Sequence, residues 1–159
     1  MIFVRVKWKS LLFALALPLA VGGLAALLTR DQMASFSQLN QPPLSPPAWL
    51  FPVVWTVLYL LMGLASYLVR YSGGDSLSIR RALTVYGIQL AVNFFWSILF
   101  FNWKVYFISF LWLVLLWVLI LATMVLFSQV RKSAVWLLLP YLLWVSFAGY
   151  LNLGIFWLN

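Results

Sequence analysis

The residues of this chain best suited to chemistry are amides and aromatic rings at helical spacing. Gln89, Asn93 and Trp96 follow one another at steps of four and three residues, so a helix places them on one face. An amide donates and accepts hydrogen bonds without carrying charge, and an indole offers a flat apolar ring with one N–H donor. Such a face predicts non-covalent binding of a planar, mostly apolar ligand.

Two other segments carry stripes of the same kind. They comprise Trp55, Tyr59, Met62 and Ser66 in the first and Tyr141, Trp144, Ala148 and Asn152 in the second. If the three stripes converge, they enclose a pocket with flat apolar walls and a few amide groups. The same amides could instead link helices to one another, since an interhelical hydrogen bond contributes about 0.6 to 2 kcal/mol. The pattern alone leaves both interpretations open.

Missing residue types exclude several kinds of chemistry. The chain has no cysteine and no histidine, and its only acids are Asp31 and Asp75. Thiolate and disulfide chemistry are therefore excluded, and the commonest haem, zinc and general-base side chain is lacking. The sequence shows no pair of nucleophile and base and no phosphate loop, which excludes the ordinary hydrolytic enzymes. We expect no required metal or cofactor.

The elements that must position these stripes are five apolar runs, each with the ~20 residues needed to cross a membrane core of ~30 Å. Of the 159 residues, 66% are hydrophobic and 8% are charged, which leaves no room for a separate soluble domain. The sequence therefore predicts an all-α integral membrane protein, a bundle of five transmembrane helices in a single domain over residues 1–159. The expected helices cover residues 10–28, 49–69, 82–101, 105–127 and 135–158. The first run continues through Gly22 and Gly23, which favours a retained helix over a cleaved signal peptide.

The ten basic residues indicate how the bundle is oriented. Eight of them lie at the amino terminus, after the second run and after the fourth, and the other two are Arg30 and Lys104. Because Lys and Arg stay on the cytoplasmic side, we expect the amino terminus inside and the carboxyl terminus outside. The net charge of +8 does not indicate nucleic-acid binding, because the basic residues stand singly or in pairs without interleaved aromatic residues.

Some residues of these runs are expected to face outward. Gly87 and Ala91 lie opposite the polar stripe of their helix and have the spacing of small residues that lets two helices approach closely, which predicts a homodimer contact. Aromatic residues also collect at membrane surfaces because their rings are amphipathic. The indoles assigned to this belt or to the lipid-facing surface are Trp8, Trp103, Trp112, Trp136 and Trp157.

Three segments, at residues 42–63, 89–97 and 140–152, carry more specific motifs. They begin Pro-Pro-Leu-Ser-Pro-Pro-Ala-Trp, Gln-Leu-Ala-Val-Asn-Phe-Phe-Trp and Pro-Tyr-Leu-Leu-Trp. Together they resemble the TspO/MBR family, the tryptophan-rich sensory proteins of bacteria, related to the mitochondrial translocator protein or peripheral-type benzodiazepine receptor. The resemblance covers nearly the whole chain and implies a five-helix bundle, commonly homodimeric, in a bacterial cytoplasmic membrane.

The resemblance also implies a ligand and a set of site residues. The cavity of the family binds porphyrins such as protoporphyrin, haem-pathway intermediates, and synthetic isoquinoline or benzodiazepine ligands. The function it implies is a sensor that regulates tetrapyrrole or stress responses. The cavity residues it implies in this chain are Trp55, Tyr59, Gln89, Asn93, Trp144, Ala148 and Asn152, with Trp49 and Phe51 near the mouth. The stripes select seven of these nine without the resemblance.

The chain departs from the family pattern at the expected lid. Ser35 and Phe36 stand where the family often has Trp-Tyr, and Leu44 stands where the proline-rich motif often has tryptophan. These departures predict weaker closure over the cavity. The carboxyl-terminal residues 151–159 also lack the vertebrate cholesterol motif, so cholesterol binding there is not expected.

Two alternative functions remain open at this point. One is facilitated passage of tetrapyrroles or lipids, without proton coupling by carboxylates, because Asp31 and Asp75 lie in loops. The other is light- and oxygen-dependent breakdown of porphyrins, in which Trp55 and Trp144 would be the oxidisable rings.

Overall fold

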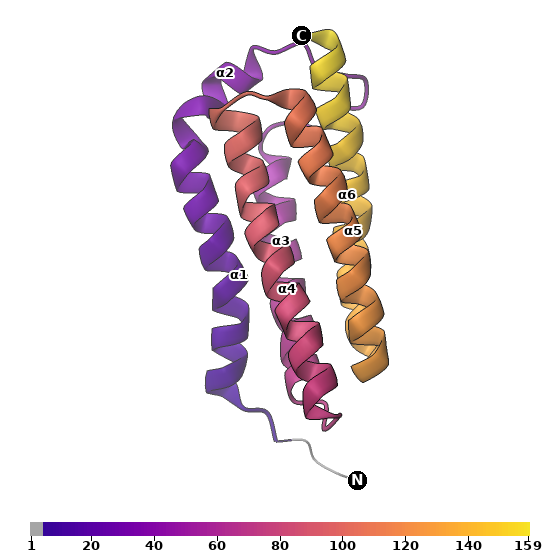
Figure 1. Ribbon diagram of the computed structural model, residues 1–159. Coiled ribbons are helices and arrows are strands. Elements are labelled where there is room, and N and C mark those ends of the chain that lie inside the picture. Colours follow the sequence, from indigo (N-terminus) through magenta and orange to yellow (C-terminus); the bar gives the residue numbers. More distant parts are fainter. Residues whose placement is uncertain (1–4) are drawn as a thin grey trace.

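Five long helices run side by side and make up most of the molecule (Figure 1). The structure is a computed structural model, and it describes residues 5–159. Its elements are α1 (Trp8–Thr29), the 3-10 turn η1 (Arg30–Gln32), α2 (Met33–Ser37), α3 (Leu50–Arg70), α4 (Ser76–Ser97), the π turn η2 (Ile98–Asn102), α5 (Tyr106–Val130) and α6 (Lys132–Leu158). Within the described residues, five helical stretches are long and apolar enough to cross a membrane. The predicted fold class is confirmed.

The helices close a ring whose order differs from their order in the sequence. α1 packs on α3, α3 on α6, α6 on α5, α5 on α4, and α4 on α1, while α3 and α4 also touch. This arrangement brings α6 beside α3, although α4 and α5 separate them in the chain. The three helices that carry the aromatic and polar stripes therefore share one interior.

The observed helices α1, α4 and α6 begin before the predicted limits, α5 ends after them, and α3 is shifted by one residue. α4 begins at Ser76 rather than near residue 82, because the Asp75 carboxylate caps it by accepting a hydrogen bond from the Ser78 amide at 3.0 Å. This bond and a second one from the Ser78 hydroxyl hold the pKa of Asp75 below its ordinary value. The predicted limits followed the apolar core of each run, whereas capping and the polar first turns lie outside that core.

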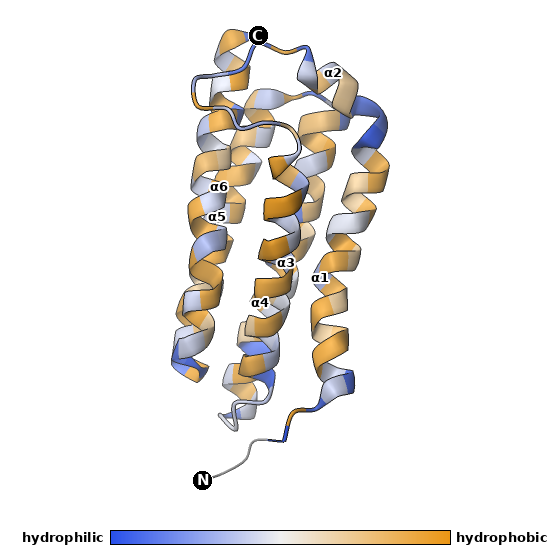
Figure 2. Cartoon of the chain, turned by 180° about the vertical axis from the view of Figure 1, so that it is seen from behind, coloured by the Kyte–Doolittle hydropathy of each residue, from blue (hydrophilic) through white to orange (hydrophobic). Residues whose placement is uncertain are grey.

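The outer surface of the bundle is apolar along its middle and polar at both ends. Figure 2 shows hydrophobic residues along the length of every long helix and hydrophilic residues at the connections. The indoles of Trp8, Trp103, Trp136 and Trp157 are exposed, as a membrane belt requires. This surface is therefore suited to contact lipid.

The expectation that Trp112 lies in the membrane belt or faces lipid is wrong, because its side chain is neither a belt residue nor fully lipid-facing. It is half-buried against the core, and its Nε1 donates a hydrogen bond to the backbone oxygen of Val92 at 2.7 Å. The physical reason is that α5 packs directly on α4, so an indole on this face of α5 reaches the neighbouring helix. Helical spacing on one helix alone does not reveal that contact.

A close approach of α1 and α3 depends on glycine. At Gly63 an added Cβ would lie 2.5 Å from the Ala14 carbonyl oxygen and 2.8 Å from the Leu15 Cα. On the facing helix, a Cβ at Gly22 would fall on the Tyr59 ring. Backbone atoms cannot rotate out of the way as a flexible side chain can, so Gly63 sets the separation of the two helices.

The proline-rich loop is fastened to the end of α6. The Tyr150 hydroxyl donates to the Pro43 oxygen at 2.6 Å, and Asn159 exchanges hydrogen bonds with the backbone of Asn40 at 3.0 and 3.1 Å. Gly154 leaves room for the Pro42 ring, which an added Cβ would approach to 2.6 Å. The loop therefore lies across the end of the bundle where α3 begins.

The helix contact at Gly63 generates a stability prediction. Gly63→Ala should lower the free energy of unfolding by about 1 to 3 kcal/mol, because α1 must move to admit the methyl group. Gly87→Ala is the matched control, since nothing lies within 4 Å of its added Cβ and alanine favours a helix by up to about 1 kcal/mol. Thermal unfolding in detergent would measure both. Equal melting temperatures would show that Gly63 does not set the α1 to α3 distance.

Candidate functional site

A continuous hydrogen-bonded chain crosses the interior between α3, α4 and α6. The Tyr59 hydroxyl donates to Asn93 Oδ1 at 3.1 Å, Asn93 Nδ2 donates to the Tyr141 hydroxyl at 2.6 Å, and that hydroxyl donates to Gln89 Oε1 at 2.8 Å. Gln89 Nε2 then points at the Met62 sulfur at 3.9 Å. All of these residues are buried. We call Tyr59, Asn93, Tyr141 and Gln89 the polar chain.

A second buried cluster lies around Asn152 on α6. Its Oδ1 accepts hydrogen bonds from Trp96 Nε1 at 3.0 Å and from the Ser109 hydroxyl at 3.3 Å, and its Nδ2 donates to the Tyr106 oxygen at 2.8 Å. Asn152 thus joins α6 to α4 and α5. Its amide is satisfied within the protein, so this cluster acts first as a helix link.

Aromatic rings surround the polar chain on the side of α3 and α6. The Trp55 ring stacks on Tyr59 with centroids 5.6 Å apart and meets Tyr141 edge-on at 6.3 Å. Phe51 meets the Trp144 ring at 5.8 Å. The site thus combines neutral hydrogen-bonding groups with flat apolar walls, which is the lining that planar apolar ligands require.

The Phe36 side chain closes the end of this aromatic cluster. It lies edge-on to Phe51 at 6.5 Å, to Phe100 at 5.7 Å and to Phe101 at 5.4 Å. Phe36 belongs to the short α2, which precedes the proline-rich loop. The segment where the sequence departs from the family pattern therefore packs on one ring at the start of α3 and on two rings of η2.

Trp144 stands between the aromatic cluster and an apolar groove on the outside of the bundle. The groove, with a volume of about 460 Å³, runs between α3 and α6. Its lining comprises Val53, Val54, Val57, Leu58, Pro140, Leu143, Trp144 and Phe147. The Trp144 Nε1 is buried and has no hydrogen-bond partner among the described residues. An unpaired buried N–H costs about 1 to 3 kcal/mol, so this indole can gain a bond from an incoming acceptor.

Most of the expected site residues lie in the interior of the bundle, where they form two separate groups. Trp55, Tyr59, Gln89 and Asn93 meet in or on the polar chain, while Asn152 belongs to the second cluster. Ala148 is buried on the same face of α6, and Phe51 and Trp144 pack on each other.

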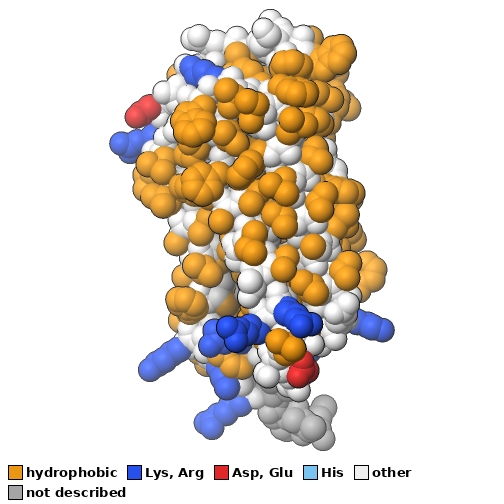
Figure 3. Space-filling view, viewed as in Figure 1, with side chains coloured by type: hydrophobic (Ala, Val, Ile, Leu, Met, Phe, Trp, Pro, Cys, Tyr) orange, Lys and Arg blue, Asp and Glu red, His pale blue; other side chains and the backbone are white. Residues whose placement is uncertain are grey.

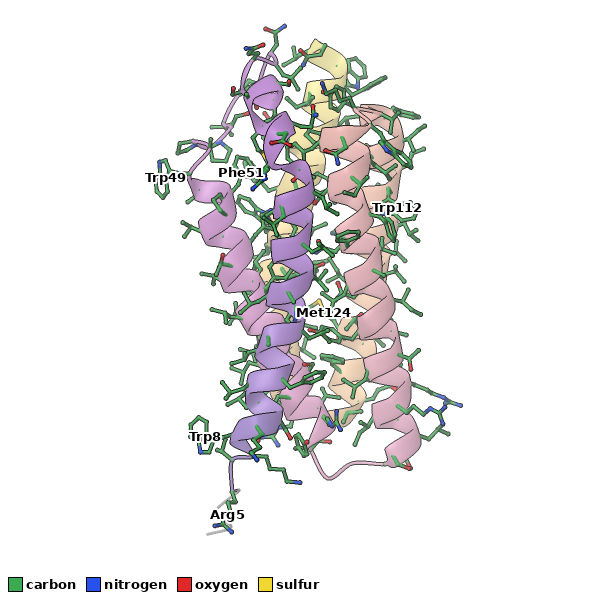
Figure 4. All side chains as sticks on the ribbon, turned by 90° about the vertical axis from the view of Figure 1, so that its left-hand side faces the viewer. Arg5, Trp8, Trp49, Phe51, Trp112 and Met124 are labelled. Atoms are coloured by element: carbon green, nitrogen blue, oxygen red, sulfur yellow. The ribbon has the colours of Figure 1, made fainter. Side chains whose placement is uncertain are left out.

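Trp49 lies apart from the other expected site residues. Its side chain is 65% exposed and points away from the bundle just before α3, as Figure 4 shows. The stiff proline-rich approach directs Phe51 inward and Trp49 outward. The expected place of Trp49 near the mouth of the site stays a prediction.

Some interior residues were not selected as site residues from the sequence. Tyr141 was part of a stripe, yet it proves to be the centre of the polar chain, with hydrogen bonds to two residues of α4. Ser109 was not among the predicted site residues, although a hydroxyl among the apolar residues of α5 could have indicated an interhelical hydrogen bond. Phe36 could not be found by spacing, because its partners lie far away in the sequence.

The site offers hydrogen bonding and stacking rather than acid and base chemistry. Within residues 5–159, no group of three or more Asp, Glu, His or Cys residues is placed to hold a metal ion. The interior groups described above are amides, phenols, indoles and one thioether. Such groups can orient and surround a ligand without charge.

Gly87 and Ala91 lie exposed on the outer face of α4, opposite the polar chain. Nothing lies within 4 Å of a Cβ added at Gly87. The face is open to a neighbour, and the homodimer contact stays a prediction that the oligomeric state of a Gly87→Leu variant would test.

The fold and the site together define a class: a multi-pass helical membrane protein whose interior is lined by neutral polar and aromatic side chains. Sequence comparison identifies the family within this class. The chain belongs to the TspO/MBR family, whose pattern matches residues 14–158. The resemblance inferred from the motifs is confirmed.

Relatives from distant organisms align over most of this chain. It is 39% identical over 151 residues to the tryptophan-rich protein TspO of Chlorobaculum tepidum, an alignment that covers 94% of this chain and 96% of that protein. It is 35% identical to the tryptophan-rich sensory protein of Cereibacter sphaeroides, covering 98% and 94%. It is 36% identical to the translocator protein of Bos taurus, covering 86% and 82%.

The central position of Tyr141 generates a second prediction. Tyr141→Phe removes one hydroxyl and leaves Asn93 Nδ2 and Gln89 Oε1 without that partner, so the free energy of unfolding should fall by about 1 to 3 kcal/mol. Tyr150→Phe is the control on the same helix, because its hydroxyl is exposed and water can replace the bond to Pro43. Chemical unfolding in detergent would compare the two. A loss no larger than the control's would show that the polar chain does not stabilise the bundle.

Proposed function

We propose that this protein binds porphyrins, such as protoporphyrin and other haem-pathway tetrapyrroles, and similar planar apolar molecules within the bundle between α3, α4 and α6. The observation that carries the proposal is the polar chain with the Trp55 ring packed on it, together with the Trp144 ring packed on Phe51. Membership of a family that includes tryptophan-rich sensory proteins supports a sensory role in tetrapyrrole or stress responses.

Binding would exchange internal hydrogen bonds for bonds to the ligand. The polar chain is satisfied without a ligand, so a molecule that enters must offer acceptors and donors in return, or it leaves buried groups unpaired. Trp144 is the exception, because its Nε1 has no partner among the described residues and would gain one. This difference makes Trp144 the residue that favours the bound state.

A ligand dissolved in the bilayer would reach the interior through the apolar groove between α3 and α6. A planar apolar ligand dissolves in lipid, and the groove's lining of aliphatic and aromatic side chains matches it. Trp144 lines the groove and also touches Phe51, which in turn meets Phe36. A ligand that displaces the Trp144 ring would therefore disturb the start of α3 and the segment before the proline-rich loop, a change that a partner could detect.

We further propose that the protein lies in a bacterial cytoplasmic membrane with its amino terminus inside. The basic residues at the end of the bundle that holds the amino terminus support this orientation, since Lys and Arg are retained on the cytoplasmic side. The proline-rich loop and the carboxyl terminus, which lie together at the other end, would then face outward.

A porphyrin titration of the purified protein tests the ligand proposal. Trp55→Phe and Trp144→Phe should each weaken protoporphyrin binding by up to about tenfold, because one stacked ring contributes about 0.5 to 1.5 kcal/mol beyond its buried area. Trp136→Phe is the control, since that indole is exposed on the outer surface of α6. Fluorescence quenching would measure the dissociation constants.

Two outcomes of that titration contradict the proposal or extend it. If all variants bind protoporphyrin equally well, the bundle interior is not the site. If the absorbance of bound porphyrin falls under light and oxygen but not in darkness, and Trp55→Phe or Trp144→Phe slows the loss, the protein also degrades its ligand.

A reporter fusion tests the orientation. Alkaline phosphatase is active only outside the cytoplasm, so it should be active when fused after Asn159 and inactive when fused after Ser72 in the α3 to α4 connection. The reverse pattern would place the basic end outside and would overturn the proposed direction of the loop.

A further inference from the structure

The end of the bundle that holds the amino terminus carries an excess of positive charge. Figure 3 shows Lys and Arg side chains gathered there, below the apolar middle of the molecule. They are Arg5, Lys7, Lys9, Arg70, Arg80, Arg81, Arg131 and Lys132, against the single acid Asp75. Across residues 5–159 the ion pair within 4.0 Å is Arg30 with Asp31, which lies at the other end. Within the described residues, no ion pair neutralises the charge at this end, so it is available to an anionic partner.

An open cleft of about 550 Å³ lies within this basic end, between the end of α3 and the first turns of α4. Its lining comprises Arg70, Ser76, Ile79, Arg80, Leu83 and Thr84. The five α4 residues recur at steps of three and four, so they form one face of that helix. Along it the polar Ser76 and Arg80 lie nearer the helix end, and Leu83 lies further toward the apolar middle, since each residue advances about 1.5 Å.

Asp75 does not neutralise the two arginines of the cleft. Its Oδ2 accepts hydrogen bonds from the Ser78 amide and hydroxyl at 3.0 and 3.1 Å, which directs the carboxylate to the start of α4. The Arg70 guanidinium carbon lies 5.7 Å from the centre of the Tyr71 ring, a contact that leaves the charge in place. Both arginines are exposed.

We propose that this cleft binds one anionic phospholipid, with its phosphate between Arg70 and Arg80 and the first part of its acyl chains over Ile79 and Leu83. Guanidinium groups match phosphate oxygens in charge and geometry. The position at the end of two membrane spans places the cleft at headgroup depth. A soluble phosphate would use the arginines alone, whereas a diacyl lipid also covers the apolar lining of the cleft.

Native mass spectrometry of the full chain tests this site. The protein in detergent would receive equimolar phosphatidylglycerol and phosphatidylcholine with identical acyl chains. Wild type should retain phosphatidylglycerol in preference, and Arg70→Gln with Arg80→Gln should reduce that retention by about 25-fold, because each cation contributes about fivefold. Arg131→Gln with Lys132→Gln removes the same charge at this end but outside the cleft, and should retain the lipid within about threefold of wild type.

The remaining measurements distinguish a specific lipid-binding site from a general effect of positive charge. Equal loss in both double variants, or equal retention of the two lipids by wild type, would overturn the proposal. Displacement of phosphatidylglycerol by an equal concentration of glycerol phosphate would show that the cleft binds a soluble anion and would also overturn it. Equal melting temperatures of the variants without added lipid would establish that lost retention does not reflect misfolding.

Discussion

The constraint on which the structure depends is that lipid offers no hydrogen-bond partner to a polar group. Backbone groups meet this constraint by forming helices, and interior side chains must meet it by bonding to one another. Tyr59, Asn93, Gln89 and Tyr141 do so across α3, α4 and α6, and Asn152 does so across α4, α5 and α6. The observed ring order of helices meets this requirement as well as that of apolar packing, because it places α6 where its polar groups reach α4 and α5.

The same constraint shapes what the interior can bind. The residues of the polar chain bond to one another, so they hold the helices together when the site has no ligand and oppose molecules that cannot replace these bonds. Trp144 differs, because its buried N–H lacks a partner among the described residues while its ring touches both Phe51 and the outer groove. Under the proposed function, the polar chain therefore stabilises the bundle without a ligand, and the unpaired N–H of Trp144 favours the bound state.

Much of the fold and part of the site could be predicted from the sequence, for identifiable reasons. The length of the apolar runs determines the number of helices, and helical spacing places Tyr59, Gln89 and Asn93 on inward faces. Which groups bond to which could not be predicted, because hydrogen bonds such as Tyr141 to Gln89 join residues of different helices. Trp112 shows the same limit, since spacing on one helix does not reveal what lies beside it.

The two ends of the bundle differ in their contacts, and this difference determines which end a change at the proposed ligand site would reach first. At the end with the carboxyl terminus, hydrogen bonds from Tyr150 and Asn159 fasten the proline-rich loop to α6, and Phe36 packs over the start of α3. At the basic end, the α3 to α4 connection is short, and its charges face outward. Under the proposed function, a ligand that displaces the Trp144 ring would therefore act first on the loop, because Phe51 and Phe36 connect them, whereas the basic end would remain at the membrane surface.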